Sequence, residues 1–161
     1  MNINFHHFAG LSIAIILIAL SSCNKVRSDP TKITMRPRVF IENSAPVPIL
    51  DEYDFVGVQL GTIANVISPN PDDRVYTLWF SLDRRSAIAI QKETVRNVGK
   101  NLQLIIAGQL VGIHPIEKGI LNGMLPFILS SNVSDENAML LYEELSRSIV
   151  HLRAEMEEQK L

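Results

Sequence analysis

The sequence of 161 residues contains a single cysteine, Cys23. One cysteine excludes a disulfide within the chain and any zinc site built from several thiolates. The chain also lacks an excess of charge of either sign, because 15 basic residues stand against 17 acidic ones. This balance excludes nucleic-acid binding through bulk positive charge. The length suffices for one domain with its own hydrophobic core.

Catalytic and metal-binding motifs are also missing. The sequence has no HExxH, no GxSxG and no phosphate-binding loop. After residue 22 the only histidines are His114 and His151, which we interpret as ordinary surface or half-buried side chains. We interpret the acidic pairs Asp51-Glu52 and Asp72-Asp73 as solvated turns. The expectation is therefore a protein without enzyme activity, metal, cofactor or small-molecule substrate.

Long hydrophobic runs are scarce, and the main one stands at the amino terminus. The mean hydropathy of +0.15 is high for a soluble domain. Residues 11–20 (LSIAIILIAL) account for much of it, with a single serine among apolar residues. This run is too short to span a bilayer, which needs about 20 apolar residues. Its length is typical of the apolar core of a secretory signal, and no later run is long enough to cross a membrane.

The residues that follow match the processing site of bacterial lipoproteins. Leu20-Ser21-Ser22-Cys23 places an apolar residue and two small residues before the cysteine. The thiol of Cys23 would receive a diacylglyceryl group, and cleavage before it would free an amine for a third acyl chain such as palmitate. Stable anchoring requires more than one chain. We therefore expect residues 1–22 to be a signal peptide and Cys23 to be the lipidation site.

One feature departs from the usual signal pattern. Residues 1–10 contain no Lys or Arg, although a signal normally carries positive charge there. An uncleaved signal anchor and a buried amino-terminal helix are the alternative interpretations.

The remainder divides into a polar tether and one domain. Residues 23–37 carry two prolines and no apolar period, which predicts a tether. Residues 38–161 are expected to form a single domain. Its expected strands are 38–42, 75–82, 102–107, 109–113 and 125–129, and 55–67 is ambiguous between strand and helix. Its expected helices are 84–98, capped by Asp83, and a final helix that begins at Ser134.

Several segments carry a finer prediction. Both faces of 75–82 are largely apolar, which predicts an interior strand. The strands on either side of Gly108 predict a hairpin. Pro126 lacks an N–H, so the strand 125–129 is expected at a sheet edge or with an irregular start. The apolar stripe expected for the first helix is Ala87, Ile90, Thr94 and Val98.

The final helix has one apolar stripe with spacings of three and four residues. Its members are Ala138, Leu141, Leu145, Ile149, Leu152 and Met156. The residues after Arg153 are mostly charged and are expected to project from the domain. Leu152 and Met156 are then the expected contacts with a partner helix. A sheet face or an exposed edge is the other candidate surface, because it can accept an extended chain by strand addition.

The order of elements predicts an α+β fold of ferredoxin-like type, with a mostly antiparallel sheet and two helices on one face. Residues 75–145 resemble the head part of the large periplasmic domain of SecD, a subunit of the bacterial protein-export machinery. The residues that carry the resemblance are Thr94 to Lys100 (TVRNVGK), the hairpin at Gly108 with Pro115 after it, Asn122-Gly123, and Ser134-Asp135-Glu136. Ala107 stands where the hairpin turn of that family usually has Asp.

This resemblance implies a SecD-head-like binding domain that is accessory to protein export. Its partners would be the membrane, through the lipid on Cys23, and exported polypeptides or the Sec machinery. The chain lacks the transmembrane helices with which SecD uses the proton gradient, so it would act as a passive module. The expected location is the cell envelope, facing the periplasm or the outside, and the outer membrane in a Gram-negative cell. The alternative is a structural or self-associating envelope lipoprotein without a role in export.

Overall fold

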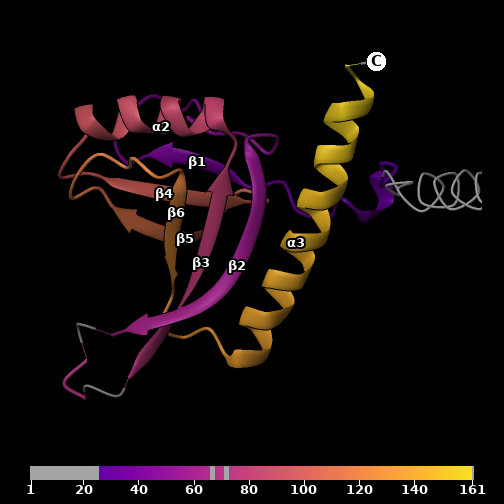
Figure 1. Ribbon diagram of the computed structural model, residues 1–161. Helices are drawn as coiled ribbons and strands as arrows, with labels where there is room; N and C mark the ends of the chain where they lie inside the picture. The colour runs from indigo at the N-terminus through magenta and orange to yellow at the C-terminus, as the bar shows by residue number, and fades with distance from the viewer. Residues whose placement is uncertain (1–25, 66–67, 71–72, 161) are drawn as a thin grey trace, which may run out of the picture.

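The computed structural model describes residues 26–65, 68–70 and 73–160. The expected signal peptide and Cys23 lie outside these residues. Figure 1 shows a curved sheet with a helix across one end of it and a longer helix along its side. The elements are η1 (Pro30–Lys32), β1 (Arg38–Ile41), β2 (Phe55–Ala64), β3 (Arg74–Leu82), α2 (Arg84–Arg96), β4 (Asn101–Ile106), β5 (Gln109–Pro115), β6 (Met124–Leu129) and α3 (Asp135–Glu158).

The strands form one six-stranded sheet in the order β1-β4-β5-β6-β3-β2. Each neighbouring pair is antiparallel. The predicted fold class is thereby confirmed as α+β, with an antiparallel sheet and two helices. From β3 onward the order is β-α-β-β-β-α, which has one strand more between its helices than the ferredoxin-like motif.

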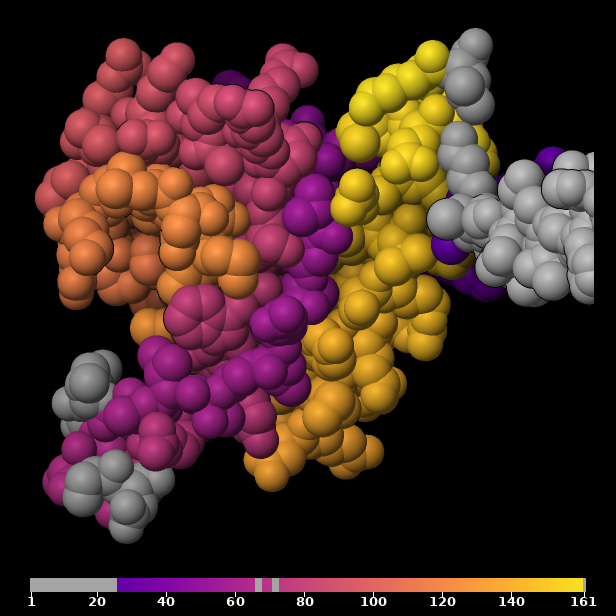
Figure 2. Space-filling view, in the orientation of Figure 1, coloured from indigo at the N-terminus to yellow at the C-terminus, as the bar shows by residue number. Residues whose placement is uncertain are grey.

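The core lies on one face of the sheet because the register aligns the apolar positions of the strands. Leu78 lies opposite Phe127, and Phe80 lies opposite Leu125. Ile90 of α2 and Leu145 of α3 belong to the same buried cluster as these strand residues. Burying each such side chain contributes about 1.5–3 kcal/mol. Both helices therefore pack on this face, and Figure 2 shows α3 lying against β2.

The ambiguous segment after residue 54 is one strand. β2 runs without a break from Phe55 to Ala64, apart from an irregularity in register between Phe55 and Gly57. Its pairing with β3 along the whole length settles its conformation. β3 itself lies between β6 and β2, as its two apolar faces predicted.

Of the two alternatives predicted from Pro126, the sheet edge was wrong, whereas an irregular start agrees with the lack of β5 pairing at residues 124–127. β6 is an interior strand between β5 and β3, and Pro126 lies opposite Trp79 of β3. The sheet tolerates the proline because β5 pairs with β6 only through Gly112 and Ile113. At the level of Pro126 there is thus no ladder on the β5 side that a missing N–H would interrupt.

The first helix is shorter than predicted. α2 begins after Asp83, whose carboxylate accepts the backbone N–H of Ser86 at 2.8 Å. It ends at Arg96, and Val98 is 54% exposed, so Val98 does not extend the apolar stripe. The buried residues of α2 are Ser86, Ile90 and Thr94. The chain turns away because Gly99 has a φ of +91°.

The residues before β1 form a strap along α3, which we define as Ser28–Met35. The buried hydroxyl of Ser148 accepts the backbone N–H groups of Thr34 and Met35 at 3.1 and 3.0 Å. The backbone N–H of Asp29 donates to Nδ1 of His151 at 3.2 Å. Most of the described part of the predicted tether is therefore held on the domain. The sequence shows no sign of this, because the acceptors lie more than 100 positions away.

Candidate binding site

The sheet has a notch where its central strand stops early. β6 has six residues, whereas β3 has nine and β2 has ten. β6 pairs with β3 from Thr77 to Ser81 only, so the beginning of β3 runs on past the end of β6. On the other side, the beginning of β5 also runs on past the last β5–β6 pair, Gly112 with Leu129. The chain leaves the sheet at Ser130 to enter α3.

This notch is a cavity of about 460 Å³ with a mostly apolar lining. Ile63 and Val75 line it from the β2–β3 hairpin, Leu110 and Val111 from β5, and Leu129 from β6. Leu110 is 55% exposed. The volume lies in the range of typical ligand pockets, and apolar walls favour an apolar occupant.

The notch also presents backbone groups. Within the described chain, no strand pairs with β5 at residues 109–111 on its β6 side, or with β3 at residues 74–76. Where β6 lies between them, β5 and β3 are separated by two strand spacings, about 9.5 Å. Beyond the end of β6 this separation leaves room for one extended chain with hydrogen-bonding edges on both sides.

Gly112 sets the approach of β5 to β6 at the rim of the notch. A Cβ at this position would stand 3.1 Å from Cβ of Phe127 and 3.2 Å from the carbonyl oxygen of Ile128. Both neighbours are held by the β3–β6 ladder, so a larger residue would push β5 away. The notch therefore depends on the absence of a side chain at this position.

His114 comes directly after the last residue of β5 that pairs with β6, at the end of this pairing that lies away from the notch. Its half-buried ring lies edge-on to Phe127, with 6.5 Å between the ring centroids. Burial lowers the pKa of His114 below its ordinary value, against the opposing effects of Glu117 and of a hydrogen bond to the backbone of Pro126. A neutral ring suits a role as filler between two strands, in agreement with the interpretation of this histidine as an ordinary side chain.

The structure places the predicted partner contacts differently from the prediction. Leu152 has no exposed surface, so its side chain is buried and unavailable to a partner. Met156 is half-buried. Ala154 is also buried, at 6% exposure, and only the residues from Glu157 onward are exposed together. The expectation that the chain projects immediately after Arg153 is thereby corrected.

The acidic pair Asp51-Glu52 is not simply a solvated turn. Glu52 is 6% exposed, and its carboxylate accepts hydrogen bonds from Arg38 at 3.0 Å and Arg36 at 3.2 Å. Burial alone would raise the pKa of Glu52, but the hydrogen bonds from Arg38 and Arg36 outweigh it and hold the pKa below its ordinary value. This cluster ties the strap end of the chain to the loop before β2.

No metal site or membrane-spanning helix is found in the part of the chain that the structure describes. There, no three His, Cys, Asp or Glu side chains come together as a set of metal ligands. None of the helices in 26–65, 68–70 and 73–160 is both long enough and apolar enough to cross a bilayer. Ser130 and Ser131 line the notch.

Comparison with known proteins finds similarity to solved structures only. No protein-family model matches the chain, and no curated protein matches it. One similar structure is SecDF, described as a membrane component that enhances protein export, with a TM-score of 0.46 and 15% identity over 66% of this chain and 41% of that one. Another is SecDF in a super-membrane-facing form, with a TM-score of 0.45 and 16% identity over 88% of this chain and 16% of that one. The chain spans less than half the length of either.

Proposed function

We propose that this protein is a lipid-anchored, non-catalytic envelope protein that binds an extended apolar segment of another polypeptide in the notch. The observation that carries the proposal is the cavity between β5 and β3, which combines apolar walls with two strand edges that no described strand pairs with. Strand addition uses these two features together, because backbone hydrogen bonds supply affinity and apolar pockets select alternate side chains. The exported polypeptide as occupant comes from the resemblance of residues 75–145 to SecD.

The strap would fix the position of the notch relative to a lipid anchor on Cys23. With a lipid on Cys23, five residues lead to Ser28, which spans at most about 18 Å. Ser28 donates its backbone N–H to Oε1 of Glu158 at 3.0 Å, so the carboxyl end of α3 would be held near the bilayer. The notch lies at the other end of this helix, next to Ser131. Because 24 helical residues extend about 36 Å, the notch would open away from the membrane.

Site-specific photocrosslinking in the native membrane tests the proposal. The full chain carries the crosslinker in place of Leu110 in the notch or, as a control, in place of Ile88 on α2, which is also exposed at 48%. We expect polypeptides in the course of export to be captured from Leu110 and not from Ile88. Val75→Arg, which places a charge on the notch wall, should abolish this capture in a chain with unchanged circular dichroism.

Two results would contradict the proposal. Capture of the same proteins from Leu110 and Ile88 would show that the notch confers no selectivity. Capture that survives Val75→Arg would place the binding elsewhere. Mass spectrometry of the mature amino terminus tests the anchor separately, since an intact Met1 would end the lipoprotein part and leave the notch untouched.

A further inference from the structure

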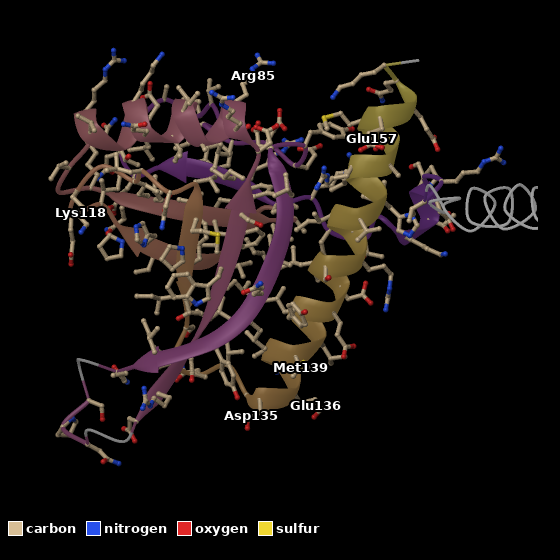
Figure 3. All side chains as sticks on the ribbon, viewed as in Figure 1. Arg85, Lys118, Asp135, Glu136, Met139 and Glu157 are labelled. Carbon is tan, nitrogen blue, oxygen red and sulfur yellow. The ribbon has the colours of Figure 1, made fainter. Side chains whose placement is uncertain are left out.

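α3 has an exposed face that nothing in the described chain covers. Met139, Leu140 and Val150 on this face are 48%, 52% and 47% exposed. At 100° per residue they lie on the side opposite Leu145, which is fully buried. Figure 3 shows Met139 on the amino-terminal half of the helix, with Glu157 near the other end. The strap occupies a different side, through Ser148.

This outer face has a hollow beside its apolar residues. The hollow is lined by Glu143, Ser146, Arg147 and Val150, with Tyr142 and His151 at its sides. Ser146 is the small residue that makes it hollow, because its neighbours on the face are all larger. A protruding side chain of a second helix has room to enter there.

Two pairs of positions on the outer face are symmetric about the level of Leu145, one pair of opposite charge and one pair of apolar residues. Glu143 lies two residues before that level and Arg147 two residues after it; Leu140 lies five residues before it and Val150 five residues after it. A face of this kind is complementary to itself in the antiparallel orientation. Two copies then place carboxylate against guanidinium and apolar residue against apolar residue, each twice.

We propose that the outer face of α3 is covered by α3 of a second copy of this chain, packed antiparallel around a two-fold axis at the level of Leu145. Glu143 then pairs with the partner's Arg147, and Leu140 packs against the partner's Val150. Within the described residues Glu143 makes no ion pair. Arg147 already holds Glu144 at 2.6 Å through one nitrogen, and its fork retains further N–H donors for the partner.

Charge complementarity is the reason to choose a second copy over another occupant. A bilayer with anionic headgroups would be repelled by Glu136 and Glu143 on this face. A foreign helix would need the reverse sequence of charges, which a second copy supplies. One helix pair buries less than the 1,200–2,000 Å² or so of a standard interface. The dimer is therefore weak in dilute solution and favoured where copies share a membrane, which raises their effective concentration.

Charge reversal in two differently tagged full-length copies tests the pairing. Both copies are expressed together and solubilised from the native membrane, and the recovery of one tag with the other is measured. Glu143→Arg in both copies, or Arg147→Glu in both copies, places like charges opposite each other and should lower the recovery about tenfold. One copy with Glu143→Arg and one with Arg147→Glu restore both pairs, so this mixture should recover like the unchanged chain.

Glu157→Arg provides the matched control, because it reverses an exposed charge on the same helix outside the proposed contact. It should leave the recovery unchanged. Three outcomes would overturn the proposal: no association of the unchanged copies, association that is insensitive to the single reversals, or failure of the mixture to restore it. The last of these would point to a different partner on this face. The pairing does not rest on the function of the notch.

Discussion

The side-chain oxygen of Ser148 on α3 accepts the backbone N–H of Met35 at 3.0 Å, across 113 positions of sequence. The same oxygen accepts the N–H of Thr34. A buried hydroxyl that receives two backbone donors fixes the end of the strap where it enters the sheet. The contact therefore determines how closely the amino terminus is held to the folded domain.

Loss of this hydroxyl should release the strap. Ser148→Ala leaves the N–H groups of Thr34 and Met35 without their acceptor, and we expect the free energy of unfolding to fall by about 1–3 kcal/mol. Amide hydrogen exchange at Thr34 and Met35 should accelerate by more than exchange in β4. Ser146→Ala on the exposed side is the control and should change stability by less than about 0.5 kcal/mol. Unchanged exchange at the strap would contradict the role assigned to Ser148.

Thr77 contains a polar group that costs stability. Its hydroxyl is fully buried in β3 and has no hydrogen-bond partner among the described residues. Thr77→Val keeps the shape and removes the unpaired group, so we expect the free energy of unfolding in denaturant to rise by about 1 kcal/mol.

Thr94 is the matched control for Thr77. It is equally buried, but its hydroxyl donates to the carbonyl of Ile90 at 2.7 Å and accepts from the N–H of Ile120 at 3.0 Å. Thr94→Val should therefore destabilise the chain by about 1–3 kcal/mol. A loss of stability of the same size in both variants would show that Thr77 is satisfied.

A residue that tolerates a positive φ at position 107 should make the β4–β5 turn, and with it the folded chain, more stable. Ala107 has a φ of +50° and Gly108 a φ of +78°, which is the two-residue turn that favours Asn-Gly. Ala107→Asn should raise the melting temperature, by an amount that corresponds to about 0.5–1 kcal/mol. Gly108→Ala should lower it, because a Cβ is strained at this φ. A turn indifferent to both changes would not have the positive φ values.

The Glu52 cluster predicts a loss of stability in acid. The pKa of Glu52 is lower in the folded chain than its ordinary value of 4.5, so folding favours the charged carboxylate. The resulting stability is fully present above pH 4.5 or so and is lost as the pH falls through the lower, folded pKa. Glu52→Gln should lower the free energy of unfolding by about 1–2 kcal/mol at pH 7.

The difference between Glu52→Gln and the unchanged chain should then shrink as the pH falls below about 4.5, where the carboxylate becomes protonated first in the unfolded chain and, at lower pH, in the folded chain. Urea titrations from pH 7 to pH 3 measure this. Glu157→Gln changes an exposed residue. Its free energy of unfolding should therefore follow that of the unchanged chain at every pH. A difference that is constant with pH would show that the charge of Glu52 does not matter.

The fold and the candidate site differed in how far the sequence predicted them. Alternating apolar residues and cap residues are local signals, so the strand at Val75 to Leu82 and the caps Asp83 and Ser134 were predicted correctly. The edge alternative for the strand of Pro126 failed because the tolerance for a proline depends on which strand lies beside it. Leu152 was expected at a surface because its burial depends on the packing of segments distant in sequence.

The class of fold follows from the sequence alone, since the 2.0 and 3.6 periods of its apolar residues indicate strands and helices. Its one cysteine, next to Leu20-Ser21-Ser22, also suffices to predict an anchor. Three features appear only in the folded chain: β6 ends before β3 and β5, the strap lies on α3, and none of the described residues covers the outer face of α3. These features depend on register and on contacts between distant segments, which local periodicity does not encode.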